Sequence, residues 1–267
     1  MGLGDSLNMI GACRYLSIYY PRVILLCSNN HIKNVRMFYS IYSIYSIEVI
    51  GTNTLDYGIE NNYVPEIFHV LSQYPQYDIL RCCVNPSLFP TRMCHPYLKI
   101  HQAPTIQYEC FIPQFYNQLG LDFDVYTKYF NVPITETAVE LYNACRKYRI
   151  AFCHPKGSTA SIQIDYKKYD EHDILIINPS TNVYEPSDKK YAIAEQFVGK
   201  PIIDYYLVLK NARYIEIIDS CFVALLFPLS LRKELAATVK ICHVRGGKRN
   251  YHAIDDSVIY YFCPAWN

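Results

Sequence analysis

The sequence begins Met1-Gly2-Leu3-Gly4-Asp5-Ser6-Leu7-Asn8 and runs directly into apolar residues at helical spacing, a pattern that stops at Tyr20-Pro21. The next stretch, 22–28 (RVILLCS), is a continuous apolar run typical of a strand buried on both faces. Further strands are predicted at 47–51 and 77–84. Because helices and strands alternate from the start of the chain, the sequence predicts an α/β fold with a parallel sheet.

The first residues also form the first candidate for a functional site. Gly2 and Gly4 leave the backbone room for close approach, and Asp5 or Ser6 can cap the helix that follows. A helix start attracts anions, and a carboxylate there is held beside whatever binds. Asp5 is therefore the first residue to consider for chemistry. An ordinary capped turn is the alternative explanation of the same four residues.

Length and composition narrow the class of protein. A chain of 267 residues can bury a large core, and two medium domains fit this length better than one. The formal net charge is only +1, so nucleic acid is not an expected partner. The 27 tyrosines are explained more simply by a compositional bias of the genome than by aromatic binding sites.

The 11 cysteines are scattered without a regular framework, which favours reduced and mostly buried thiols. Cys94-His95 and His101 follow the pair Cys82-Cys83, but their spacing is not that of a zinc site, so no metal is expected. No apolar stretch reaches the length of a membrane helix, and no signal sequence is recognised. We therefore expect a cytoplasmic protein with no transmembrane segment, a description compatible with peripheral membrane contact.

The regular alternation is lost after Leu121, which predicts a domain junction there. The expected organisation is an N-terminal domain over 1–125, a C-terminal domain over 134–249, and an apolar segment, 250–267, that packs back on the body. Thr135 is expected to cap a helix, and further helices are predicted at 202–210 and 222–231. Strands of the second domain are predicted at 149–154, 173–179, 214–218 and 239–244.

Polar residues gather where these four strands end. In an open parallel sheet the carboxyl ends of the strands lie along one edge, where ligands bind. Hydroxyls, a helix start and cations at that edge suit a diphosphate. Each residue taken singly can also be a solvated loop charge, a helix cap or a hydrogen-bonded core histidine. The clusters are His154 with Lys156 and Ser158, Asn178 with Ser180, Asp219 with Ser220, and His243 with Arg245.

Three features together resemble the heptosyltransferase-like glycosyltransferases. They are the Gly-Leu-Gly-Asp opening at 2–5, the Tyr-Pro before an apolar strand at 20–21, and the Ile-Ile-Asp-Ser turn at 217–220 before a buried helix. The matching stretches are 2–28 and 211–227, with a looser match over 152–158. The resemblance implies the GT-B architecture, in which two Rossmann-like domains with parallel sheets face each other across a cleft.

The resemblance also implies roles for the candidate residues. Asp5 would be the general base on the acceptor hydroxyl, with inversion at the sugar carbon, and Gly2, Gly4 and Ser6 would form the acceptor-side loop. The nucleotide-sugar donor would bind the C-terminal domain. Such chemistry needs no metal and no further cofactor, because helix starts and a cation can stabilise the leaving diphosphate. The donor-binding residues would be His154, Lys156, Ser158, Asn178, Asp219, Ser220 and Arg245.

Two departures limit what the resemblance implies. The family has a strand before the Gly-Leu-Gly-Asp loop, whereas this sequence opens directly on the loop. The family's donor-side motif reads Asp-Thr/Ser-Gly-Leu with a following His, whereas this chain has Asp-Ser-Cys-Phe at 219–222. Heptose is therefore not implied as the sugar. The expected function is transfer of a sugar from a nucleotide-sugar to a hydroxyl of a glycan or glycoconjugate. The alternative is a non-catalytic nucleotide- or glycan-binding protein, and a phosphotransferase is disfavoured because no P-loop sequence is present.

Overall fold

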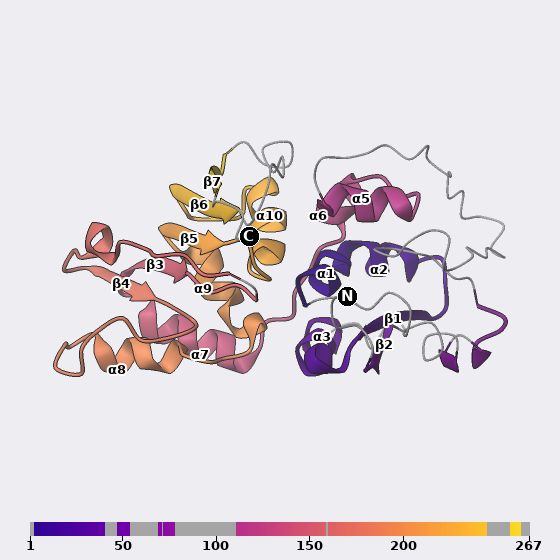
Figure 1. Cartoon of the computed structure of the whole chain (residues 1–267), viewed down its shortest axis with the longest axis horizontal. Helices are drawn as coiled ribbons and strands as arrows, with labels where there is room; N and C mark the ends of the chain where they lie inside the picture. The colour runs from indigo at the N-terminus through magenta and orange to yellow at the C-terminus, as the bar shows by residue number, and fades with distance from the viewer. Residues whose placement is uncertain are drawn as a thin grey trace. The chain divides into compact units, whose positions relative to one another are not determined.

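The fold is described from a computed structural model of the chain. It describes residues 3–40, 47–53, 69–70, 72–77, 111–158, 160–244 and 257–262. The chain divides into two compact units, Met1–Asn131 and Val132–Asn267 (Figure 1). The division falls in the stretch left between the two expected domains, 126–133. The predicted strand at 77–84 lies outside the described residues except for Tyr77.

The first unit contains the two predicted strands, β1 and β2, which pair in parallel with Val23 opposite Ile47. Both predictions are confirmed. Helices α1, α2 and α3 contact β1, and α3 also contacts β2. The elements of this unit are α1 (Leu3–Asn8), α2 (Ile10–Leu16), β1 (Val23–Ser28), η1 (Asn29–His31), α3 (Ile32–Tyr39), β2 (Ile47–Thr52), α5 (Phe111–Gln118) and α6 (Asp124–Lys128).

Close approach of α2 to α6 explains why a glycine stands at position 11. A Cβ at Gly11 would lie 2.6 Å from the carbonyl oxygen of Val125 and 2.8 Å from that of Tyr126. The contact is completed by Tyr116, whose hydroxyl donates to the carbonyl oxygen of Asn8 at 2.7 Å. Any side chain at position 11 would push the two helices apart.

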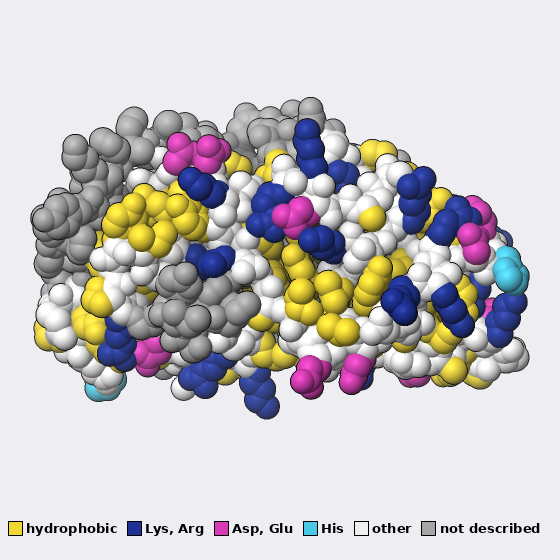
Figure 2. Space-filling view, turned by 180° about the vertical axis from the view of Figure 1, so that it is seen from behind, with side chains coloured by type: hydrophobic (Ala, Val, Ile, Leu, Met, Phe, Trp, Pro, Cys, Tyr) yellow, Lys and Arg dark blue, Asp and Glu magenta, His cyan; other side chains and the backbone are white. Residues whose placement is uncertain are grey.

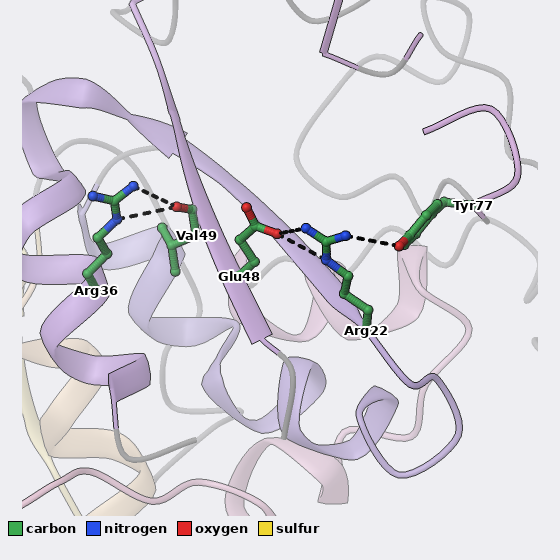
Figure 3. A network of polar contacts seen from close by, with 5 residues as sticks. All are labelled: Arg22, Arg36, Glu48, Val49 and Tyr77. Atoms are coloured by element: carbon green, nitrogen blue, oxygen red, sulfur yellow. Dashed lines mark hydrogen bonds and ion pairs between the residues drawn. The ribbon is translucent and has the colours of Figure 1, made fainter. Parts of the chain in front are cut away.

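Two arginines donate hydrogen bonds to residues of β2 (Figure 3). Arg22 donates to the carboxylate of Glu48 and to the hydroxyl of Tyr77, the latter at 3.3 Å. Arg36 donates to the carbonyl oxygen of Val49 from Nε at 3.4 Å and from a second nitrogen at 3.3 Å. Because the Arg22–Glu48 pair is exposed, solvent screens its charges and it contributes little to stability.

The second unit is built on a five-stranded sheet in the order β4-β3-β5-β6-β7, with every neighbouring pair parallel (Figure 1). Four of its strands are those predicted. The fifth, β7, lies in the segment 250–267 and was not predicted as a strand. The elements are α7 (Glu136–Cys145), β3 (Arg149–His154), η3 (Tyr166–Tyr169), β4 (Ile174–Ile177), α8 (Tyr191–Ala194), η4 (Glu195–Phe197), η5 (Ile202–Tyr205), α9 (Tyr206–Asn211), β5 (Tyr214–Ile218), α10 (Val223–Leu231), β6 (Val239–Val244) and β7 (Ile259–Phe262).

The two faces of this sheet are covered differently. One face carries Ala151 and Cys153, which pack with Ile164 and Tyr169 of the connection between β3 and β4. Side chains alternate along a strand, so Phe152 and His154 lie on the other face. That face is contacted by α9 and by aromatic rings from η5 and the start of α10. Both faces are therefore buried, as the continuous apolar strands predict.

The described part of the chain is thus an α/β protein with parallel sheets, compatible with Rossmann-like domains. Five of its six described cysteines are buried, as predicted. Lys and Arg side chains are spread among acidic and apolar ones over the face seen in Figure 2, in keeping with the net charge of +1. None of the described helices combines the length and the apolar character needed to span a membrane.

Candidate ligand-binding site

The strand order places a topological switch point in the second unit between β3 and β5. From β3 the chain proceeds to β4 on one side, and from β4 it returns to β5 on the other side of β3. In doubly wound sheets with this order, the connections leave the two central strands in opposite directions, and a crevice opens at their carboxyl ends. Ligands bind in that crevice. His154 ends β3, and Asp219 and Ser220 directly follow β5.

His154 and Ser220 meet across this switch point. Nδ1 of His154 lies 3.1 Å from Oγ of Ser220, although the two residues are 66 positions apart in the sequence. Ser220 Oγ also accepts a long hydrogen bond, 3.4 Å, from the backbone N–H of Phe222 at the start of α10. The predicted convergence of these two strand ends is therefore confirmed.

The ring of His154 is held among aromatic side chains. Its centroid lies 4.6 Å from that of Phe222 in an edge-on arrangement, and Phe222 in turn contacts Phe152 and Tyr205. Only 8% of His154 is exposed. Burial disfavours the charged ring and lowers the pKa of His154 to about 4, so the imidazole is neutral at pH 7.

The other two buried candidates of this edge make structural contacts. Asn178 follows β4; its side-chain oxygen accepts from the N–H of Ser180 at 2.9 Å, and its amide donates to the hydroxyl of Tyr166 at 3.0 Å. Asp219 is 6% exposed, and its backbone N–H donates to the carbonyl oxygen of His243 on β6 at 2.8 Å. These bonds join the carboxyl end of β4 to η3 and the carboxyl end of β5 to β6.

Lys156 and Ser158 lie on a short hairpin directly after β3. Lys156 forms an antiparallel bridge with Ser161, and the N–H of Gly157 donates to the carbonyl oxygen of Ala160 at 2.8 Å. Both Lys156 and Ser158 are exposed, so each can reach a ligand from the surface. Arg245 lies outside the described residues.

In the first unit, the expected loop at residues 2–6 is wrong for its described part. Helix α1 already begins at Leu3, so Gly4, Asp5 and Ser6 are helical, and Asp5 stands in the first turn rather than at a cap. The carbonyl oxygen of Asp5 accepts from the N–H of Met9 at 3.2 Å. Ser6 is fully buried because its turn packs on α3, where the hydroxyl of Tyr39 donates to the Ser6 carbonyl at 2.9 Å. Gly2 lies outside the described residues.

A buried carboxylate that the sequence analysis did not single out lies on the other face of the sheet. Glu216 of β5 is 3% exposed. One of its oxygens lies 2.9 Å from Nε2 of His243, and the other lies 2.5 Å from Nζ of Lys168 and accepts from the hydroxyl of Tyr169 at 2.8 Å. A charged residue inside the apolar run 214–218 was the signal that could have identified it.

The charge of Glu216 is stabilised by its neighbours. Burial raises the pKa of Glu216, but the hydrogen bonds from His243, Lys168 and Tyr169 outweigh burial and lower the pKa to about 2. The ionised carboxylate can only accept hydrogen bonds, so Nε2 of His243 carries the proton in their contact. This network anchors η3, at the end of the β3–β4 connection, to β5 and β6.

Among the described residues no three His, Cys, Asp or Glu side chains gather in a way that could hold a metal ion. The cysteines and histidines at 82–101, considered above for zinc, lie outside that part of the chain. Comparison with protein-family models, with curated proteins and with solved structures finds no match for this chain. The candidate site therefore stands on its own geometry.

Proposed function

We propose that the chain is a glycosyltransferase and that its second unit binds the nucleotide-sugar donor at the carboxyl ends of β3 and β5. The observation that supports this most is the contact of His154 with Ser220 at the topological switch point, 3.1 Å between Nδ1 and Oγ. The exposed Lys156 and Ser158 would approach the diphosphate from the hairpin that follows β3, and Asp219 would lie beside the sugar or phosphate.

The proposed reaction is a single displacement with inversion. An oxygen of the acceptor hydroxyl bonds to the anomeric carbon while the bond from that carbon to the donor phosphate breaks, and the leaving diphosphate takes the electron pair. Asp5 accepts the hydroxyl proton as general base. Polar groups at the end of β3 and the start of α10 would stabilise the leaving charge, so transfer is expected to persist in EDTA. The GT-B arrangement, two Rossmann-like domains facing across a cleft, belongs to the same proposal.

A second candidate is a non-catalytic nucleotide- or glycan-binding protein. The observation that favours it concerns the proposed base. Asp5 stands in the first turn of α1 next to the fully buried Ser6, instead of in an open loop. The donor-side residues of the second unit do not depend on that turn, so binding could remain where transfer does not occur.

A screen of nucleotide diphosphates and nucleotide-sugars by thermal shift and calorimetry tests the binding step. A ligand at 100 times its Kd is expected to stabilise the protein by about 2.7 kcal/mol. His154→Ala should abolish that shift. His172→Ala is the matched control, because His172 is exposed and precedes β4, at the amino edge of the parallel sheet. The absence of a shift with every nucleotide would contradict the proposal.

Transfer of a labelled sugar from the best-bound donor then separates the two candidates. The glycosyltransferase proposal expects transfer that Asp5→Asn reduces by about 100-fold or more with donor Kd unchanged, because a general base contributes on that scale. Full activity of a folded Asp5→Asn protein would remove the role of Asp5. Tight binding without transfer to any hydroxyl acceptor would favour the non-catalytic candidate.

A further inference from the structure

The hydrogen bonds around Ser220 bear on which nitrogen of His154 carries its proton. A serine hydroxyl has one proton to donate and lone pairs with which to accept. At Ser220 the backbone N–H of Phe222 is directed at Oγ, so that bond uses a lone pair. The hydroxyl proton of Ser220 remains available for the contact with Nδ1 of His154, 3.1 Å away. When Ser220 donates this proton, Nδ1 is the acceptor, and in the neutral ring the proton sits on Nε2.

The position of the ring leaves Nε2 for a ligand. Among the described residues Nε2 has no hydrogen-bond partner, while His154 as a whole is 92% buried, since 8% is exposed. Phe222 packs edge-on against the ring and is itself held by Phe152 and Tyr205, so the ring plane is fixed. Nε2 itself is not fully enclosed, so an acceptor oxygen of a ligand can approach it and supply the missing hydrogen bond.

We propose that His154 donates its Nε2–H to an anionic oxygen of the ligand, and that Ser220 is the positioning residue that fixes this tautomer. The identification of that oxygen as a phosphate oxygen of the donor rests on the proposed function. A neutral imidazole donor recognises an acceptor oxygen and cannot itself accept from a ligand hydroxyl at the same atom. Sugar hydroxyls can also accept from this N–H, but a bond to a charged phosphate oxygen is the stronger one, so the phosphate end of the donor is favoured.

The tautomer can be measured in the free protein. Long-range ¹H–¹⁵N NMR of ¹⁵N-histidine-labelled protein at pH 7 distinguishes the two nitrogens, and His154→Gln assigns the His154 signals among the 8 histidines. We expect the Nε2–H form in the wild type and a mixture in Ser220→Ala. A wild-type ring protonated on Nδ1 would overturn the inference and leave the proposed function standing.

Two amide substitutions at position 154 test the contact with the ligand. The Gln side-chain nitrogen occupies the place of Nε2, whereas that of Asn occupies the place of Nδ1. With nucleoside diphosphates and inorganic pyrophosphate as probes in calorimetry, His154→Gln should keep Kd within about threefold, and His154→Asn should raise it by about tenfold or more. Circular dichroism and Tm establish that both variants fold.

The outcomes separate the inference from the proposed function. If His154→Asn binds the probes as tightly as His154→Gln, the anion is not held by Nε2 and the inference is wrong, while nucleotide binding itself remains. If the wild type binds none of the probes, the proposed function fails and the assignment of a phosphate ligand fails with it, and the NMR measurement still decides the tautomer.

Discussion

At the scale of single residues, Glu216 carries a large electrostatic effect. A buried carboxylate is costly unless its charge is matched, and here three side chains match it: His243, Lys168 and Tyr169. Cys153 lies opposite Glu216 on β3, and its own burial together with this charge raises the pKa of its thiol, which stays protonated. Burial and the charge of Glu216 thus act in the same direction on this thiol.

Glu216 predicts a loss of stability in acid. Its folded pKa of about 2 lies below the ordinary value of 4.5, so the unfolded state takes up protons first as the pH falls. Its contribution is complete above pH 4.5 and is lost as the pH falls towards 2. Urea unfolding at pH 7, 4.5 and 3 should show this decline for the wild type and a smaller one for Glu216→Gln.

The same substitution should lower the free energy of unfolding at pH 7 by about 2 kcal/mol, because it weakens the charge-assisted hydrogen bonds that His243 and Tyr169 make to Glu216 inside the protein, whereas the exposed Lys168 can be solvated. Glu171→Gln is the matched control. Glu171 pairs with Arg149 at the surface, where solvent screens the two charges, so its replacement should lower the free energy of unfolding much less. Equal effects of the two substitutions would mean that burial of Glu216 does not strengthen its interactions.

At the scale of elements, local signals place most helices and strands correctly. Thr135 caps α7 as predicted, and its hydroxyl accepts from the N–H of Ala138 at 3.0 Å. The same hydroxyl donates to the buried carboxylate of Asp204 at 2.6 Å, a contact that the sequence does not reveal. One side chain therefore joins the start of α7 to η5.

Thr135→Ala should destabilise the protein by about 2 kcal/mol. Loss of the cap costs about 1 kcal/mol, and Asp204 loses its partner inside the protein at a similar cost. Thr135→Ser keeps the hydroxyl and should stay within about 0.5 kcal/mol of the wild type. Urea unfolding measures both. An alanine variant as stable as the serine variant would show that neither bond matters.

Helix α1 is the element on which local reasoning was wrong. Two glycines and a polar pair favour a capped loop by propensity, yet residues 3–8 form a helix. The buried side chains of Ser6 and Leu7 and the bond from Tyr39 supply tertiary contacts that outweigh the cost of about 1 kcal/mol for a helical glycine. Packing decided the conformation of this segment.

At the scale of the whole molecule, all the described candidates for donor binding belong to one compact unit. His154, Lys156, Ser158, Asn178, Asp219 and Ser220 lie between Val132 and Asn267, whereas Asp5 belongs to the other unit. The second unit has its own sheet and core, which is the condition for folding alone. The proposed binding residues and the proposed general base therefore belong to different units.

A fragment comprising 132–267 tests this division. It should unfold in one cooperative transition and bind the same nucleotide with a Kd within about threefold of the full chain, a difference below 1 kcal/mol. His154→Ala in the fragment should remove binding, as we also expect in the full chain. A fragment without a cooperative transition would show that the second unit needs the first in order to fold.

The sequence by itself determined the α/β class, the cap of α7, six of the described strands and the polar residues at strand ends, because apolar runs and caps act over a few neighbouring residues. It could not determine that β3 lies beside β5, that β7 joins the sheet, or that Glu216 has three partners. These depend on pairing between segments tens of residues apart. Only the tertiary structure brings His154 to Ser220, because strand order is set by how both faces of the sheet are buried.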